Sequence, residues 1–279
     1  MPFVQIIILA VVQGITEFLP VSSSAHLILV PKLTGLQDQG LLVDVAVHVG
    51  TLLAVMIYFW RDLLGMSTAL VSMPRQISNH HRFNPEYWLF LKLVVATLPV
   101  IVAGFLVNFF MGDILRSIEV IAWATLGFGL LLLIADKSNM TVRKIEHISF
   151  AGAIMVGIFQ VFALIPGTSR AGVTMTAARF LGVERQDAAR FSLLLSIPAI
   201  VGAGTLKGLE LYQTSDPVLN GVVLTVGGLA FLFALVAISL LMVWLRRASF
   251  TPFVVYRFLL GGALLYYVYG APGLSQLTN

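Results

Sequence analysis

The sequence predicts an all-α, polytopic integral membrane protein that combines about six transmembrane helices with two re-entrant pairs of broken helices. Hydrophobic residues make up 58% of the 279 positions and charged residues only 11%, and the mean hydropathy is +0.95. Soluble domains carry about 25% charged residues, so this composition excludes an ordinary soluble domain. We expect the chain to be surrounded by membrane lipids and to have no nucleic-acid partner.

Six uninterrupted apolar segments predict the transmembrane helices. A helix needs about 20 residues to cross roughly 30 Å of hydrocarbon. The chain has no cysteine, which excludes disulfides and thiolate chemistry. The six segments are residues 41–60, 88–110, 118–134, 188–206, 218–245 and 253–269.

Two further apolar segments, residues 3–30 and 150–181, are each interrupted by proline and small polar residues. Proline cannot continue a helix and disfavours helical backbone at the preceding residue. The first segment lacks a preceding Lys or Arg, and its break falls where a signal peptide is continuously apolar, so we expect it to remain in the mature protein. We predict that each segment forms two half-helices that enter and leave the membrane on the same side.

The distribution of Lys and Arg predicts the orientation. With both broken segments re-entrant, eleven of these residues fall on one face and three on the other, whereas counting either segment as a full span scatters them. By the positive-inside rule the first face is cytoplasmic, so both termini and the first break lie outside. The eleven are Arg61, Arg75, Arg82, Lys137, Arg143, Lys144, Arg179, Arg185, Arg190, Arg246 and Arg247; the three are Lys32, Arg116 and Lys207.

An internal repeat relates the two broken segments, VVQGITEFLPVSSSAHL and GIFQVFALIPGTSRAGV, at an offset of 146 to 148 residues. Pro20 pairs with Pro166, and Ser23 with Ser169. An odd number of crossings separates the copies, so they would be inverted, and inverted repeats of discontinuous helices commonly form a polar site near the bilayer midplane. We predict a single membrane domain over 1–279, with repeats of about 1–110 and 150–245 and a final span at 253–269.

The restart of each broken segment predicts an anion site. The serines at positions 22 to 24 suit helix N-caps, and a half-helix that begins there directs its free N–H groups and positive dipole end into the site. Arg170 adds donors that match phosphate oxygens in bidentate fashion. Phosphate is the favoured ligand, and a carboxylate is left open. The predicted phosphate-binding residues are Ser24, Gly167, Thr168, Ser169 and Arg170.

Glu17 beside an anion site predicts a divalent cation. An ionisable group at membrane depth costs roughly 2.5 to 3.5 kcal/mol and usually marks function, but a bare carboxylate repels an anion. Gln13 lies four residues earlier, on the same helix face. We expect Glu17 and Gln13 to hold Mg²⁺ or Ca²⁺, which bind oxygen ligands and neutralise charge during phosphoryl transfer.

His26 and a second histidine complete the candidate site. His26 follows Ser22 and Ser23 by four and three residues, a spacing that suits an activated nucleophile or a proton shuttle. Asp44 and His48 repeat the four-residue spacing in the next span, where they would support the residues that touch the ligand. Placement at the membrane interface is the alternative for this pair.

Three motifs together resemble the undecaprenyl-pyrophosphate phosphatase family, the bacitracin-resistance proteins of bacteria. They are EFLPVSSSAH with the preceding Gln13, DVAVHVGT at 44–51 and PGTSRAG at 166–172. The resemblance extends over nearly the whole chain, including RFSLLLSIPA at 190–199 and SFTPFVVYRF at 249–258. It implies an enzyme of the inner membrane that uses a divalent metal to remove the terminal phosphate from undecaprenyl diphosphate. The product is the lipid carrier for peptidoglycan and other envelope polymers.

The resemblance also implies roles for individual residues. Gln in the first position of the acidic motif leaves one carboxylate where many relatives have two. Ala171 stands where Ser is frequent, so a hydroxyl there is not essential in this chain. The acidic motif maps onto Gln13 and Glu17, the serines and histidine onto Ser22, Ser23 and His26, and the PGxSR loop onto Pro166, Gly167, Ser169 and Arg170.

These observations predict an outward-facing phosphatase whose lipid substrate lies between the spans. Ser23, with Ser22 in second place, attacks the terminal phosphorus or positions a water, and His26 handles the proton. Glu17 and Arg170 hold the metal and the phosphates. The rival is a secondary transporter or a polyprenyl-phosphate lipid translocase, because inverted repeats and broken helices are transporter architecture. The sequence leaves the oligomeric state open, a homodimer included.

Overall fold

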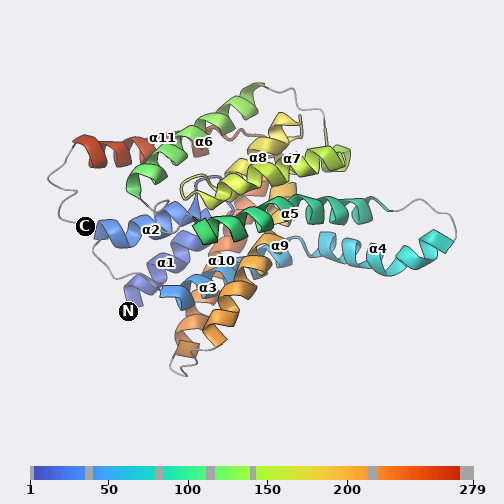
Figure 1. Cartoon of the computed structure of the whole chain (residues 1–279), viewed down its shortest axis with the longest axis horizontal. Helices are drawn as coiled ribbons and strands as arrows, with labels where there is room; N and C mark the ends of the chain where they lie inside the picture. The colour runs from blue at the N-terminus through green and yellow to red at the C-terminus, as the bar shows by residue number, and fades with distance from the viewer. Residues whose placement is uncertain are drawn as a thin grey trace.

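A computed structural model describes residues 3–34, 40–78, 84–110, 117–138, 143–212 and 219–270. These residues form helices joined by short loops, with one isolated parallel β-bridge between Arg143 and Val183, so the predicted all-α class is confirmed (Figure 1). The α-helices are α1 (Phe3–Thr16), α2 (Ser23–Thr34), α3 (Gly40–Tyr58), α4 (Trp60–Ser78), α5 (Pro85–Phe110), α6 (Ile118–Ser138), α7 (Phe150–Val161), α8 (Arg170–Phe180), α9 (Arg185–Tyr212), α10 (Leu219–Trp244) and α11 (Thr251–Leu265).

Within the described ranges, four helices are long and apolar enough to cross a membrane. Three of them are Pro85–Leu106 in α5, Ile118–Ser138 in α6 and Val223–Trp244 in α10. The fourth, Thr251–Gly270, consists of α11 and the turn that extends it. A fifth candidate is the pair Leu42–Tyr58 and Trp60–Met73, which is bent by 76° where α3 meets α4. These five correspond to five of the six predicted spans. The span predicted at 188–206 lies in α9, which does not meet the same test, so the count of six stays a prediction.

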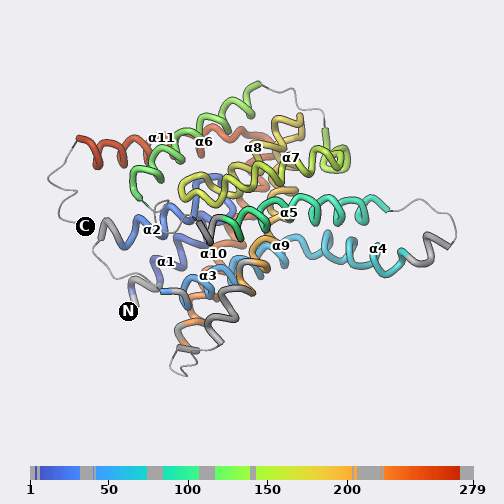
Figure 2. The backbone as a smooth tube through the Cα atoms, in the orientation of Figure 1, coloured from blue at the N-terminus to red at the C-terminus, as the bar shows by residue number. Residues whose placement is uncertain are grey.

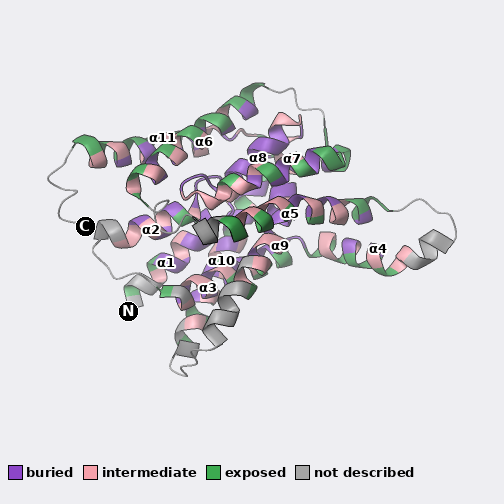
Figure 3. Cartoon of the chain, viewed as in Figure 1, coloured by how far each residue is buried: buried purple, intermediate pink, exposed green. Residues whose placement is uncertain are grey.

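The distribution of polar and apolar side chains is that of a protein embedded in lipid. Exposed positions are concentrated on the outer helices (Figure 3). Many of the exposed residues are large and apolar, whereas several polar and charged side chains are buried. A charged group at this depth is costly unless it is paired within the protein. Exposed examples are Val71, Phe105 and Leu224, and buried ones are Gln13, Glu17, Thr51, Arg179 and Arg257.

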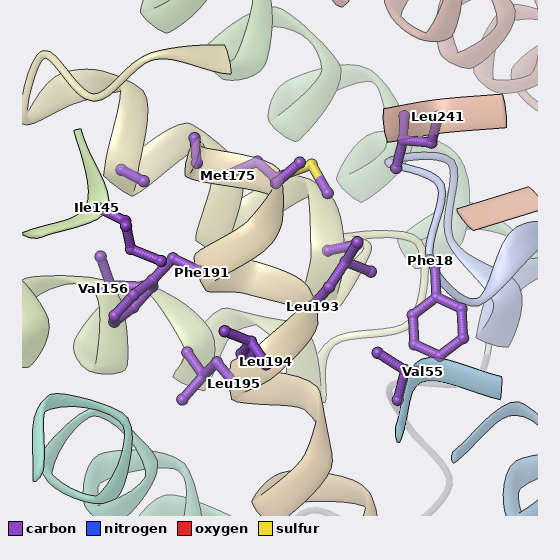
Figure 4. Close-up of a cluster of buried hydrophobic side chains, with 14 of the residues drawn as sticks. Phe18, Val55, Ile145, Val156, Met175, Phe191, Leu193, Leu194, Leu195 and Leu241 are labelled. Atoms are coloured by element: carbon purple, nitrogen blue, oxygen red, sulfur yellow. The ribbon is translucent and has the colours of Figure 1, made fainter. Parts of the chain in front are cut away.

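The largest apolar core surrounds the first turns of α9. Phe191 and Leu193 of α9 are fully buried and belong to one cluster with Met175 of α8 and Val55 of α3 (Figure 4). Phe18 joins the same cluster and is also fully buried. Because Phe18 directly follows Glu17, this packing fixes the backbone that carries the Glu17 carboxylate.

Helices from the two halves of the chain pack against each other. α1 and α3 contact α10, whereas α7 and α9 contact α5, as the colours of Figure 2 let the reader follow. Small residues allow the close approach: a Cβ added at Gly14 of α1 would lie 2.8 Å from the Ala230 carbonyl oxygen, and one at Gly157 of α7 would lie 2.5 Å from that of Ala96. The early helices of each half therefore pack on the last helix of the other half.

A buried carboxylate ties α6 to three later elements. Asp136 of α6 forms ion pairs with Arg179 of α8 at 3.4 Å and with Arg185 of α9 at 2.6 Å, and it accepts a hydrogen bond from the Phe250 amide at 3.2 Å. Arg190 of α9 likewise pairs with Asp62 of α4. Three of the arginines assigned to the cytoplasmic face thus also hold helices together.

The two ends of the described chain lie on one side of the molecule. Figure 1 shows the start of α1 and the end of α11 at the left of the view. The predictions that both termini share a compartment, and that this compartment is outside, stay predictions. Arg82 and Arg116, two of the charges used for the orientation, lie outside the described residues.

Candidate active site

The first break lies where Pro20 predicts it. α1 ends at Thr16, a turn follows, and α2 begins at Ser23. Ser22 takes a left-handed backbone conformation with φ of 77°, and its Oγ accepts a hydrogen bond from the Ala25 amide at 3.4 Å. Ser22 therefore caps the second half-helix, as residues of this type commonly do.

The second break repeats this geometry. A 3-10 turn at Phe162–Leu164 follows α7, and α8 begins at Arg170. Ser169 has a φ of 69°, and its Oγ accepts from the Gly172 amide at 3.1 Å. Among the described residues other than glycine, Ser22 and Ser169 alone have positive φ. By backbone conformation, Ser22 therefore corresponds to Ser169. The alignment of the two repeats instead pairs Ser169 with Ser23, the next residue along the chain.

The Glu17 carboxylate joins the two breaks. Oε1 lies 3.2 Å from Arg170 Nη2 of the second break, while Oε2 accepts hydrogen bonds from Ser23 Oγ at 2.7 Å and from Gln13 Nε2 at 2.9 Å. The Glu17 side chain is 7% exposed and that of Arg170 is 15% exposed. The structure thus brings Gln13, Glu17, Ser23 and Arg170 into one largely buried cluster.

Gln13 and Glu17 also offer oxygen atoms to a cation. Gln13 Oε1 is buried without a hydrogen-bond partner. In the described part of the chain, no group of three or more His, Asp or Glu side chains could hold a metal ion. The free amide oxygen beside a carboxylate fits a hard divalent cation that takes its remaining oxygen ligands from water or a phosphate.

The serine hydroxyls have different partners. Ser23 Oγ donates to Glu17, whereas Ser22 Oγ caps the helix and lies 3.2 Å from Ser24 Oγ. Ser24 is exposed. A hydroxyl in contact with a carboxylate can give up its proton as it attacks, so the geometry favours Ser23 as the reactive serine.

The His26 ring contacts neither Ser22 Oγ nor Ser23 Oγ. Its Nδ1 lies 2.6 Å from the Ser22 carbonyl oxygen, and its Nε2 lies 2.5 Å from the Tyr256 hydroxyl of α11, with the two rings stacked. A carbonyl oxygen only accepts, so Nδ1 carries the proton, and Nε2 of the neutral ring accepts from Tyr256. The role of His26 in proton transfer stays a prediction, and Tyr256 was not foreseen from the sequence.

The loop of the second break depends on a glycine. Gly167 has a φ of +95°, and a Cβ there would lie 2.5 Å from the Ile121 carbonyl oxygen of α6. Backbone conformation and helix packing therefore both require glycine at this position, and its role in phosphate binding stays a prediction. The buried Thr168 Oγ1 has no hydrogen-bond partner among the described residues, whereas Ser169 Oγ caps α8 and donates to the Leu19 carbonyl oxygen at 3.4 Å.

His48 lies near the cluster. Its Nδ1 lies 2.6 Å from the Asp44 carbonyl oxygen, so the two residues are joined through the backbone. The His48 imidazole is close enough to interact electrostatically with the Glu17 carboxylate. The supporting roles predicted for His48 and for the Asp44 side chain stay predictions.

Residues 6–263 match the family model described as bacitracin resistance protein BacA. The chain belongs to this family. A relative named undecaprenyl-diphosphatase, from Ruegeria pomeroyi, is 48% identical over 266 residues, which cover 95% of this chain and 98% of the relative. Undecaprenyl-diphosphatase 1 of Rhodospirillum rubrum is 45% identical over 282 residues, with 99% and 98% covered. The undecaprenyl-diphosphatase of Hahella chejuensis is 46% identical over 271 residues, with 97% and 100% covered.

Proposed function

We propose that this protein hydrolyses undecaprenyl diphosphate to undecaprenyl phosphate and inorganic phosphate, with Glu17, Ser23 and Arg170 at the centre of the reaction. The activity follows from membership of the BacA family and from relatives named undecaprenyl-diphosphatase that match end to end. The observation that carries the site is the Glu17 carboxylate, which contacts Ser23 of its own break and Arg170 of the other. The product returns to the synthesis of peptidoglycan and envelope polymers at the inner membrane.

The two breaks supply the groups that bind the diphosphate. The half-helices that begin at Ser23 and Arg170 present free N–H groups and positive dipole ends. Arg170 shares its guanidinium between Glu17 and the Ser192 carbonyl oxygen, and its remaining donors would bind a terminal phosphate oxygen. The unpartnered hydroxyl of Thr168 is a further donor.

The contact between Ser23 and Glu17 defines the chemical step. The sequence predicts that His26 handles the proton, but the hydrogen bonds of the His26 ring go to the Ser22 carbonyl oxygen and to Tyr256, so we propose Glu17 as the acceptor instead. As Ser23 Oγ attacks the terminal phosphorus, its proton passes to Glu17 Oε2, 2.7 Å away, and the bond from that phosphorus to the bridging oxygen breaks. Undecaprenyl phosphate leaves, and a water then hydrolyses the phosphoserine to regenerate the enzyme. The alternative is direct attack by a water held by Ser23, with the same acceptor. General-base help of this kind contributes about 10²- to 10⁴-fold to the rate.

A divalent cation fits the same site. Gln13 Oε1 and the Glu17 carboxylate would hold Mg²⁺ or Ca²⁺ together with oxygens of the diphosphate. When bound, such an ion would neutralise the charge that builds up on the phosphate oxygens.

We further propose an inverted repeat of two re-entrant halves, with six spans and the site facing the periplasm. The shared conformation of Ser22 and Ser169 and the reciprocal packing of α1 on α10 and α7 on α5 support it. Because the chain has no cysteine, single cysteines can test the sidedness. A membrane-impermeant thiol reagent should label Ser24→Cys in intact spheroplasts and leave Arg246→Cys unlabelled; the reverse pattern would contradict the orientation.

The decisive test is release of phosphate from undecaprenyl diphosphate by the purified protein in detergent, with Mg²⁺ or Ca²⁺ present. Detergent micelles have no second compartment, so turnover there separates an enzyme from a transporter. We expect turnover that is lost in Glu17→Ala and Arg170→Ala and kept in Asp62→Asn, which breaks the pair with Arg190 outside the site. Absence of phosphate release with either cation would refute the proposal.

A further inference from the structure

Arg257 of α11 is a fully buried arginine at the meeting point of the two breaks. Its Nη1 donates to the carbonyl oxygens of Pro20, at 3.3 Å, and of Thr168, at 3.0 Å. Its Nη2 donates to those of Gly167, at 3.0 Å, and Ala124, at 3.4 Å. Its Nε donates to Thr125 O at 3.0 Å. One side chain therefore holds the first break, the second break and α6.

The donors and acceptors match one to one. A guanidinium has five N–H donors in a fixed planar fork, and Arg257 directs one toward each of five backbone carbonyls. Within the described part of the chain, its ion-pair and hydrogen-bond partners include no carboxylate. Arg257 thus differs from Arg179, the other fully buried arginine, which is paired with Asp136.

Three of the five carbonyls that accept from Arg257 belong to the breaks, and the other two belong to α6. Where a helix is interrupted at membrane depth, its carbonyl oxygens lose their intrahelical partners, and lipid cannot replace them. Pro20 O belongs to the first break, while Gly167 O and Thr168 O belong to the second. A single donor group shared between both loops makes the position of each dependent on the other.

The surrounding helices leave room for this guanidinium. A Cβ added at Gly129 of α6 would lie 3.3 Å from Arg257 Nε, and one at Gly172 of α8 would lie 3.0 Å from Nη1. Lysine would not substitute, because it offers a compact ammonium with three donors in place of a planar fork of five.

We propose that Arg257 is a positioning residue for phosphate hydrolysis, which locks the two breaks together and thereby sets Glu17 against Arg170. The inference rests on the proposed function. Glu17 lies three residues before Pro20, and Arg170 two residues after Thr168, so a shift of either loop moves one partner of the 3.2 Å pair. Among the described residues, Arg257 donates hydrogen bonds to backbone carbonyls alone, so we assign it no part in bond making.

The first experiment compares Arg257→Lys with Arg179→Lys in phosphate release. Arg179 is the matched control, because it is equally buried but binds Asp136 and Val183 away from the breaks. We expect Arg257→Lys to lower kcat on the order of 100-fold, the cost typical of displaced catalytic groups, with KM little changed. Arg179→Lys should retain kcat per folded molecule. The wild-type protein is measured in the same assay. If the wild-type protein releases no phosphate, the proposed function fails; if it does and Arg257→Lys is equally active, this inference alone fails.

A distance measurement reports the positioning directly. Spin labels on Ile15→Cys, at the end of α1, and Phe162→Cys, just before the second break, use two exposed sites of a cysteine-free chain. The distance distribution between the labels should broaden or shift in Arg257→Lys and stay unchanged in Arg179→Lys. Wild-type kcat or an unchanged distribution in Arg257→Lys overturns the proposal.

A second pair of variants decides the matter if Arg257→Lys does not fold. Gly129→Ala places a methyl group against Arg257, whereas Gly127→Ala, on the same helix, meets nothing within 4 Å. We expect Gly129→Ala to lower kcat and to broaden the label distances, and Gly127→Ala to do neither. Equal behaviour of the two alanine variants overturns the proposal.

Discussion

Replacement of the two adjacent serines separates catalysis from helix capping. Ser23→Ala removes the hydroxyl that lies 2.7 Å from Glu17 Oε2, and loss of a nucleophile with its base contact should lower kcat at least 10³-fold. That loss equals about 4 kcal/mol of barrier. Ser22→Ala removes a cap whose contact with the Ala25 amide is 3.4 Å, which costs about 1 kcal/mol of stability. Alanine takes the same φ of 77° as serine at this position, so backbone strain does not change.

The assay pairs phosphate release with thermal unfolding on the same purified samples. Ser23→Ala should unfold near the wild-type temperature and have lost its activity, whereas Ser22→Ala should unfold earlier and keep kcat within about threefold, a barrier change under about 1 kcal/mol. Ser67→Ala is the control for removal of an exposed hydroxyl outside the site. The reasoning is refuted if Ser23→Ala retains a tenth of the wild-type kcat, or if Ser22→Ala is the inactive variant.

Three further substitutions test the remaining contacts. Glu17→Gln removes the charge that faces Arg170 and weakens the acceptor for Ser23, so phosphate release should fall at least 10³-fold; activity above 1% would contradict this role. Gln13→Glu places a second carboxylate at the cation site and should lower the Mg²⁺ or Ca²⁺ concentration for half-maximal activity in a chelator titration, whereas an unchanged requirement would place the ion elsewhere. Tyr256→Phe removes one hydrogen bond to His26, worth about 0.5 to 1.5 kcal/mol, so kcat should fall no more than about tenfold; a loss as large as in His26→Ala would assign Tyr256 a direct part in the reaction.

The breaks and their capping residues were predictable because local chemistry determines them. Pro20 and Pro166 interrupt two apolar helices, and a serine precedes the start of each new half-helix. The repeat also predicted that Glu17 and Arg170 converge on one site, whereas their direct ion pair was not predicted, because Glu17 was assigned to a cation and Arg170 to the phosphates. Sequence patterns therefore identified most of the residues in the cluster.

The contacts made by α11 were not predictable from the sequence. Tyr256 reaches His26 across 230 positions, and Arg257 binds carbonyl oxygens, which every residue carries and which leave no pattern in the sequence. The serine run likewise does not show which hydroxyl faces Glu17. That choice depends on the positive φ of Ser22, which rotates its side chain into the cap.

The packing of each half on the last helix of the other constrains how the chain assembles during synthesis. α1 and α3 leave the ribosome long before α10, the helix against which Gly14 and Gly50 pack. Until Leu219–Trp244 has been inserted, the first half lacks a partner for these surfaces and has only lipid or an insertase to cover them. The N-terminal half is therefore an incomplete folding unit, and Arg257 can join the two breaks only after α10 and then α11 have been synthesised and inserted.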